Sequence, residues 1–537
     1  MCIRVFHKAK KEHFNFLFAV IAIAVLVTLS VFQPFGVRHA EAWFSTYKYR
    51  KLITFDRTLV PSTQNDFPVL VSFNDPDMKL DSDCTIGTPP IDGPCHAQGW
   101  DIVFTNTSDV QLNYDIESYT SDATNGTIVM WVLLPTLNGV GAASDTSIYM
   151  YYGKTGATDT QNPSAVWASG FVGVWHMKEN PTGVEPTIKD SKGVLHGTEQ
   201  GGMVSTDSVI GKIGNALNFA GGTNDYVVVG ANPALDSANV MVSAWVKGSA
   251  QGSFMYAIGK GANACQAASY ALETFQSNFG TTANMEFYIS QDGSNQTKST
   301  NPLVLDNTWR HLVGVFDDTN NLIQFYVNGA QVSSSATTNS INHTGTTNNN
   351  LGFGNYLGTC ALLFVGQMDE IKISNVSRGA AWITAEFNNQ TNQGYRPTQP
   401  TAFISALGVE ESAPAGGYAT SGTYTSNNIT ISPLRAWNVL KWGEDVSGAC
   451  PTCDIKLQIQ TAPDLAGAPN WAAGSQWCGP GGVCGASCGA SGNWYTVPSG
   501  TRAPTLHNGH VWIRYCASFI GDGAQTPILN WVRINYQ

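Results

Sequence analysis

Short apolar runs separated by polar turns dominate the chain after its N-terminal region. The runs at 68–73, 127–132 and 147–152 are rich in β-branched and aromatic residues and are bounded by Gly, Asn, Asp or Pro, which is the pattern of β-strands. Residues 311–316 and 322–327 flank a polar turn and predict a β-hairpin. The pattern therefore predicts an all-β protein made of antiparallel sheets.

Amphipathic helix signals are scarce. The clearest covers residues 377–389, where Ser377 can cap the helix and Ile383 and Phe387 lie four residues apart. This predicted helix ends the second of three segments, and a linker stiffened by two prolines follows it. The predicted boundaries are 43–160, 165–395 and 401–537 for the segments and 396–400 for the linker.

Residues 1–42 have the features of an export signal. A basic start precedes an apolar run at 16–32, and the small-x-small triplet at 40–42 follows, as in a secretory signal cleaved after Ala42. The run is nearly long enough to span a bilayer, so an uncleaved N-terminal anchor is the alternative. Both readings predict a secreted or cell-surface protein, with membrane contact only through this segment and only if the segment stays uncleaved.

The charge of the remaining chain argues against nucleic acid as a partner. Residues 43–537 contain 23 basic and 37 acidic residues, a net charge of −14, whereas phosphate binding needs a basic surface. Charged residues make up only 12% of the chain while Gly is abundant, a composition typical of extracellular β proteins.

The first segment contains a set of recognisable motifs, at residues 49–51, 66–71, 101–105, 115–119, 130–132 and 148–153. In these motifs it resembles a bacterial extracellular domain of unknown function. The resemblance implies a β-rich domain in the bacterial envelope and no settled activity.

The second segment contains its own set of motifs, at residues 190–193, 214–219, 225–227, 242–246, 309–311, 326–329 and 368–373. In these motifs it resembles a laminin-G-like, concanavalin-A-like jelly roll. The resemblance implies a sandwich of two antiparallel sheets, which is common in sugar-binding and adhesive proteins.

The third segment is similar to a β-sandwich module found at the end of exported bacterial proteins. The similarity rests on residues 424–426, Trp437, Trp442, 455–460 and 526–529. The segment also holds seven of the fifteen tryptophans.

Ten of the eleven cysteines follow the signal, and an even number in an exported protein predicts disulfides rather than zinc ligands. We expect Cys84 to pair with Cys95 across a Pro-rich loop, and Cys265 with Cys360 within the jelly roll. The last six allow fifteen connectivities, so their pairing stays open. These six are Cys450, Cys453, Cys478, Cys484, Cys488 and Cys516.

The resemblance to a jelly roll also implies a structural calcium ion. Asp369, at the start of the last strand, corresponds to a carboxylate ligand in such domains, and Asp190 beside a turn is a second candidate, since Ca²⁺ takes oxygen ligands from carboxylates and carbonyls. The alternative is that both are turn residues that bond to nearby backbone.

No catalytic set stands out, and the protein is expected not to be an enzyme. Asp115 and Glu117 lie two apart and share a face of a predicted strand, as a glycosidase pair would. Nothing else in the sequence frames a groove around them, so an acidic solvent-facing strand is the preferred interpretation. Trp131, Trp245 and His311 lie in strand-like runs and are expected to be buried.

Aromatic and amide side chains in loops are the candidate ligand-binding residues, because sugar rings stack on aromatic faces and sugar hydroxyls bond to amides. Packing within a small core is the alternative for each. The candidates are Asn355, Tyr356, Trp471, Trp477 and Trp494.

These observations predict a surface protein for binding or adhesion, with a lectin-like jelly roll that recognises glycan or protein. A structural subunit of a surface layer, filament or envelope assembly is the first alternative, since exposed strand edges permit self-assembly. An accessory role beside a carbohydrate-active enzyme is the second.

Overall fold

The computed structural model describes residues 44, 46–81, 93–183, 186–220, 224–262, 264, 268–275, 283–291, 296–300, 303–344, 348–360, 362–391, 402–413, 421–430, 436–445, 452–474, 476–521 and 527–536. The predicted signal (1–42) and linker (396–400) lie outside these residues. The chain is mostly β, as predicted. None of its helices within the described ranges has the length and apolar character needed to cross a membrane.

Two small antiparallel sheets form the N-terminal region. One has the order β22-β1-β6-β3, with β23 also pairing with β1, and the other has the order β2-β5-β4. Side chains such as Val69, Phe104 and Val132 fill the core between them. The strands are β1 Tyr49–Phe55, β2 Gln64–Asp75, β3 Val103–Asn106, β4 Tyr114–Ser121, β5 Gly126–Leu137, β6 Thr146–Tyr152, β22 Ile404–Leu407 and β23 Glu411–Ser412.

Strands β22 and β23 come from the start of the predicted third segment. Ile53 of β1 pairs with Leu407, and Tyr49 pairs with Ser412. The structure therefore moves the boundary that was predicted at residue 401, because residues 404–412 complete the N-terminal sheet. Pairing between strands so far apart in sequence leaves no local signal.

Two larger sheets form the jelly roll. The eight-stranded sheet has the order β19-β18-β17-β12-β21-β10-β9, with β7 also pairing with β21, and the seven-stranded sheet has the order β16-β15-β14-β13-β20-β11-β8. The predicted hairpin is present as β17 and β18. The strands are β7 Phe171–Trp175, β8 Gly197–Gln200, β9 Ser208–Ile210, β10 Asn215–Phe219, β11 Tyr226–Val229, β12 Val240–Lys247, β13 Tyr256–Ala262, β14 Tyr270–Phe275, β15 Asn284–Ser290, β16 Gln296–Thr300, β17 Arg310–Asp317, β18 Leu322–Val327, β19 Ala330–Ala336, β20 Asn348–Phe353 and β21 Gly366–Ser374.

Alternation along β21 sends side chains to two different environments. Met368, Ile371 and Ile373 enter the core between the two sheets, while Asp369 and Lys372 are buried outside that core. The face of the eight-stranded sheet that points away from this core is therefore also covered by protein rather than by water.

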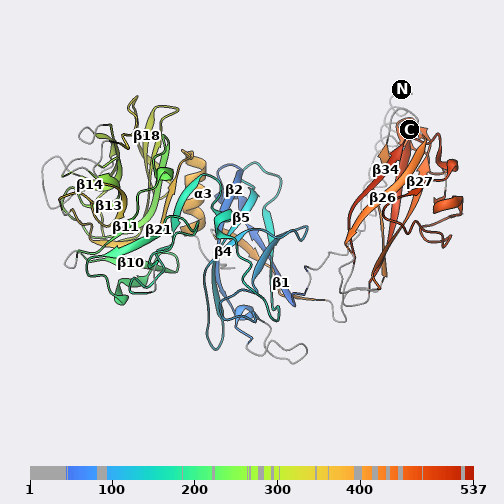
Figure 1. Ribbon diagram of the computed structural model, residues 1–537, viewed down its shortest axis with the longest axis horizontal. Helices are drawn as coiled ribbons and strands as arrows, with labels where there is room; N and C mark the ends of the chain where they lie inside the picture. The colour runs from blue at the N-terminus through green and yellow to red at the C-terminus, as the bar shows by residue number, and fades with distance from the viewer. Residues whose placement is uncertain are drawn as a thin grey trace, which may run out of the picture.

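Helix α3 (Ala380–Thr391) covers this face of the jelly roll and lies between the jelly roll and the N-terminal region (Figure 1). It begins three residues after the predicted cap, Ser377. Its Trp382 ring lies 4.7 Å from that of Phe67, between centroids, while Ile383 packs with Met241 of the jelly roll. A short helix, α2 (Pro163–Val166), precedes β7. The N-terminal region and the jelly roll are thus joined by a shared core.

The C-terminal residues form a separate sandwich at the far end of the molecule (Figure 1). Its sheets have the orders β24-β33-β27-β30-β31, with β25 also pairing with β33, and β32-β26-β34, and a hairpin joins β28 to β29. Trp437 and Trp442 are buried in its core. The strands are β24 Ser421–Thr425, β25 Ile429–Thr430, β26 Trp437–Asp445, β27 Asp454–Ala462, β28 Asp464–Leu465, β29 Ala468–Pro469, β30 Trp477–Cys478, β31 Cys484–Gly485, β32 Thr501–Arg502, β33 Trp512–Ile520 and β34 Ile528–Tyr536.

Disulfides stabilise this sandwich, as predicted. Cys478 pairs with Cys484, and Cys488 with Cys516, which resolves part of the pairing that the sequence left open. The described residues Cys95, Cys360 and Cys453 are disulfide-bonded as well. The predicted pairs Cys84–Cys95 and Cys265–Cys360 each include a residue outside the described part of the chain, as does any pair with Cys450.

Candidate functional site

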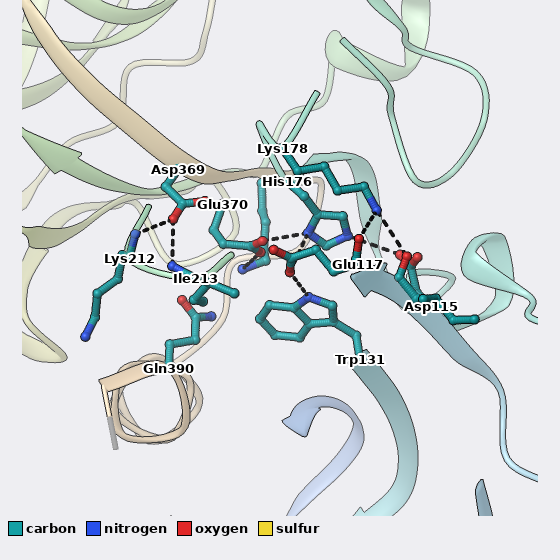
Figure 2. A network of polar contacts seen from close by, with 12 residues as sticks. Asp115, Glu117, Trp131, His176, Lys178, Lys212, Ile213, Asp369, Glu370 and Gln390 are labelled. Carbon is teal, nitrogen blue, oxygen red and sulfur yellow. Dashed lines mark hydrogen bonds and ion pairs between the residues drawn. The ribbon is translucent and has the colours of Figure 1, made fainter. Parts of the chain in front are cut away.

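A buried polar cluster lies where the N-terminal region meets the jelly roll (Figure 2). Strand β4 supplies Asp115 and Glu117, His176 follows β7 directly, and β21 supplies Asp369 and Glu370. All five are buried. We call these five residues the interdomain cluster.

Two irregular strands direct the glutamates into the cluster. The pairing of β4 with β5 shifts register between Ile116 and Ser118, so Glu117 occupies a bulge. Glu370 has a φ of 51°, in the left-handed region that is uncommon for a side chain other than Gly. Bulges re-aim side chains beside functional sites. The irregular backbone at Glu117 and at Glu370 brings a carboxyl group from each strand next to His176.

His176 is the centre of the cluster. Its Nδ1 lies 2.6 Å from Oε1 of Glu370 and 3.7 Å from Oε2 of Glu117. Its Nε2 lies 3.2 Å from Oδ2 of Asp115. Burial lowers the pKa of His176, but Glu370 and Asp115 outweigh it and raise that pKa well above the ordinary value. The imidazole is therefore held as a cation between carboxylates.

Indole donors hold two of these carboxylates in place. Nε1 of Trp131 donates to Oε2 of Glu117 at 3.0 Å, and Nε1 of Trp167 donates to Oδ2 of Asp115 at 2.9 Å. Burial and the charge of Glu370 raise the pKa of Glu117 to about 8. Burial also opposes ionisation of Asp115, but the hydrogen bond with His176 lowers its pKa.

Two lysines border the cluster. Nζ of Lys372 lies 3.0 Å from Oε2 of Glu370 and 3.3 Å from Oε1 of Glu386 on α3. Lys178 donates to the backbone oxygens of residues 116 and 117 at 3.1 and 2.8 Å. These cations offset part of the negative charge, as burial of several carboxylates requires.

The interpretation of Asp115 and Glu117 as an acidic, solvent-facing pair is wrong. Their residues are only 3% and 5% exposed, because β4 faces the jelly roll rather than water. Sequence reasoning also missed the role of His176 and Glu370. The only signal in the sequence was that each of two segments contains two acidic residues close together. Nothing in the sequence shows that folding brings these two segments into contact.

The two candidate calcium ligands have different surroundings. The Asp190 carboxylate accepts hydrogen bonds from four backbone N–H groups, those of residues 174, 192, 194 and 195, which fits its alternative role in a turn. Oδ2 of Asp369 accepts from the N–H groups of Lys212 and Ile213 at 2.8 Å each. Its Oδ1 is buried without a hydrogen-bond partner among the described residues. Asp369 therefore keeps an oxygen that could bind a cation.

A groove of about 330 Å³ opens where β10 and β12 end and β21 begins. Gln367 of β21 pairs with Asn218 on one side and Lys247 on the other. Directly paired residues present side chains to the same face, so these three form a polar row along the groove. Oε1 of Gln367 is buried without a hydrogen-bond partner in the described structure.

The predicted aromatic ligand residues lie outside this groove. Tyr356 is only 1% exposed and packs on Tyr256, and Trp477 is 6% exposed. Burial removes both from the candidate set. Oδ1 of Asn355 accepts from the backbone of residue 362. Trp471 and Trp494 are half-buried in the C-terminal sandwich, far along the chain from the jelly-roll groove.

Comparison with protein families matches two parts of the chain. Residues 98–174 match a domain of unknown function, DUF2341, and residues 221–384 match the concanavalin A-like lectin/glucanases superfamily. The chain carries a DUF2341 domain followed by a laminin-G-like domain. The DUF2341 match extends into β7, which pairs with β21 of the jelly roll, and ends two residues before His176. A search of curated proteins found no match.

Solved structures give distant similarities to part of the chain. Domain 4 of AbnA, an extracellular GH43 arabinanase from Geobacillus stearothermophilus in complex with arabinotriose, is 18% identical, with 40% of this chain and 96% of that chain covered and a TM-score of 0.31. The binding domain of botulinum neurotoxin serotype C1 is 12% identical, with coverage of 43% and 53% and a TM-score of 0.30. The chain thus spans about half the length of that toxin domain.

Proposed function

We propose that the protein is exported and displayed at the cell surface, where its laminin-G-like domain binds a glycan. The groove beside Gln367 carries the proposal. It offers an amide, a second amide from Asn218 and the ammonium group of Lys247 in one row, and such groups bond to sugar hydroxyls. The domain belongs to a lectin-like superfamily, which supports the same ligand class.

The small volume of the groove favours a short polar ligand. Its volume of about 330 Å³ is at the lower end of the range for small-molecule sites. Trp309, half-buried beside the groove, lies 5.9 Å from Nζ of Lys247 and offers an aromatic face near its rim. We expect weak binding per site, with a few hydrogen bonds and one stacking contact.

A glycan array probed with the exported chain tests this function. Gln367→Ala should reduce binding to the preferred glycan, because it removes the central polar group of the row. Gln324→Ala, on β18 of the same sheet but outside the groove, is the matched control and should bind normally. Absence of glycan binding by the folded protein, with calcium or with a chelator, overturns the proposal, as does unchanged binding by Gln367→Ala.

Burial of Asp115 and Glu117 supports a binding role without catalysis. A glycosidase pair has to flank a sugar bond in an open site, whereas these two carboxylates lie inside the molecule. The disulfides of the C-terminal sandwich support the proposed export, because such bonds persist in oxidising compartments.

Self-association through β19 is a second candidate function. This strand lies at the edge of the eight-stranded sheet, is exposed at all but one position, and contains neither charge nor proline. Such an edge lacks the usual protection against pairing with another chain. Sedimentation velocity of the native protein and of Ser334→Lys tests it, since a monomer at all concentrations excludes an assembly built on this edge.

A further inference from the structure

Three side chains from distant parts of the sequence converge in the interdomain cluster. Ligand atoms of Glu117, His176 and Glu370 all lie within 4.8 Å of one another, and all three residues are buried. Glu117 belongs to the DUF2341 domain, whereas Glu370 belongs to the laminin-G-like domain. No other set of three or more His, Cys, Asp or Glu side chains in the described part of the chain is arranged in this way.

The groups behind these three residues resemble the outer shell of a metal centre. Histidine ligands usually donate their second ring N–H to a carboxylate, which fixes the ring. In this protein, Nε2 of His176 faces Asp115 at 3.2 Å, which leaves Nδ1 directed at the two glutamates. Trp131 in turn donates to Glu117 at 3.0 Å.

Carboxylate oxygens in the cluster lack partners. Oε1 of Glu117 and Oδ1 of Asp369 are buried and accept no hydrogen bond from the described residues. The side chain of Glu117 is 0% exposed. Buried carboxyl oxygens normally accept a hydrogen bond or bind a cation, so these two atoms are available as ligands.

We propose that Glu117, His176 and Glu370 bind one divalent transition-metal ion, with Zn²⁺ as the best fit, and that this ion joins the DUF2341 and laminin-G-like domains. One imidazole nitrogen with carboxylate oxygens is a zinc donor set, whereas Ca²⁺ and Mg²⁺ take oxygen ligands alone. Asp115 is a positioning residue that orients the ring.

Metal binding requires protons to leave and the ligands to separate slightly. The Nδ1–H proton of His176 passes to solvent as the metal–nitrogen bond forms, and the carboxyl proton of Glu117 passes to solvent as its oxygen binds the ion. Nδ1 and Oε1 of Glu370, now 2.6 Å apart, separate to roughly 3.3 Å, which follows from zinc bonds of about 2.0–2.2 Å in a tetrahedral arrangement. The ion therefore replaces the hydrogen bond between His176, directly after β7 of the jelly-roll sheet, and Glu370 of β21 in the same sheet with two coordinate bonds. Its bond to Glu117 of β4 is the one that crosses to the DUF2341 domain.

The first experiment measures zinc in the purified full-length exported chain after chelation, dialysis and reloading. Plasma mass spectrometry should find one zinc per chain, and the Tm should rise with zinc concentration. His176→Gln and Glu370→Gln should bind zinc more than 100-fold more weakly, and Asp115→Asn roughly 10- to 100-fold more weakly. Glu273→Gln, a buried carboxylate of the laminin-G-like domain outside the cluster, is the control and should bind zinc normally.

The second experiment does not depend on the folding of any variant. Cobalt substituted into the native chain should give the visible absorption of a tetrahedral site with nitrogen and oxygen ligands. The proposal is overturned if folded native protein retains no zinc, shows no shift of Tm and gives no cobalt spectrum. The interdomain cluster would then be an ion-pair network without a metal. Stabilisation by calcium but not by zinc would overturn it as well, and would favour a calcium site at Asp369.

Discussion

Asn389 of α3 forms two hydrogen bonds with the backbone of Leu70, 319 residues earlier in the chain. Its Oδ1 accepts from the Leu70 N–H at 2.7 Å, and its Nδ2 donates to the Leu70 oxygen at 3.1 Å. Strand β2 is the edge of its sheet, so these backbone groups have no strand neighbour on that side. One amide side chain thus closes a buried sheet edge and attaches the jelly roll to the N-terminal region.

Asn389→Leu should therefore destabilise the protein by about 2–4 kcal/mol, because it leaves two buried backbone groups without partners. Hydrogen exchange should show loss of protection at the Leu70 amide. Thr391→Ala, at the exposed end of the same helix, is the control and should change the free energy of unfolding by no more than about 0.5 kcal/mol. Full protection of Leu70 in Asn389→Leu would contradict the assigned role of the side chain.

Acid should weaken the jelly roll through His311. This residue is 0% exposed, and its Nε2 lies 3.1 Å from Oγ of Ser243. Burial lowers its pKa to about 4, so the unfolded chain binds a proton at a higher pH than the folded chain does. Stability is complete above the unfolded pKa of about 6.5 and falls as the pH drops toward 4, by up to about 3 kcal/mol.

Thermal unfolding of the native chain and of His311→Gln between pH 7 and pH 4 measures this effect. The variant should be less stable at pH 7 but should lose less stability on acidification. Parallel pH profiles for the two proteins would show that His311 does not cause the dependence.

The two disulfides of the C-terminal sandwich should contribute unequally. Cys488 and Cys516 are separated by 28 residues, whereas Cys478 and Cys484 are separated by 6. Closing the longer loop removes more entropy from the unfolded chain, so the chain-entropy relation gives about 3.5 and about 2 kcal/mol. Calorimetry of the two double Cys→Ala variants compares them, and equal losses would contradict the loop-length account.

Arg514 should stabilise the loop that carries Trp471. Its guanidinium carbon lies 4.2 Å from the centre of the Trp471 ring and 5.1 Å from that of Trp477, and Gln460 accepts two of its N–H groups. Arg514→Lys keeps the charge but loses the planar stack, at a cost of about 1 kcal/mol. Tryptophan fluorescence should shift to longer wavelength as Trp471 becomes more exposed, and an unchanged spectrum would exclude the stack as the support of this loop.

Local patterns predicted most of the fold but little of the site. The strands and the hairpin at 311–327 were predictable because β-branched residues and turn residues act over short distances. Trp131, Trp245 and His311 are buried as predicted, since strand position indicates burial. Tyr356 was misjudged because a loop residue can still enter a core, and sequence alone does not show what packs above it.

The interdomain cluster could not be predicted for a different reason. Asp115 and Glu117 share a strand face, as expected, but what covers that face depends on His176 and Glu370 from another domain. Bulges at Glu117 and Glu370 also break the regular alternation on which the pattern argument depends. Sites built across domains from irregular strands leave only weak signals in each segment.

The pairing of Tyr49 with Ser412 has a mechanical consequence for a protein held at one end. The chain enters the first two domains at β1 and leaves them at β23, and these strands are neighbours in one sheet. Tension applied between the N-terminus and the C-terminal sandwich passes directly across this pair, so the jelly roll is outside the path of the load. Because the pulled ends lie at the same end of the antiparallel pair, its hydrogen bonds break one after another, and stretching of single molecules should record a low-force step before the jelly roll unfolds.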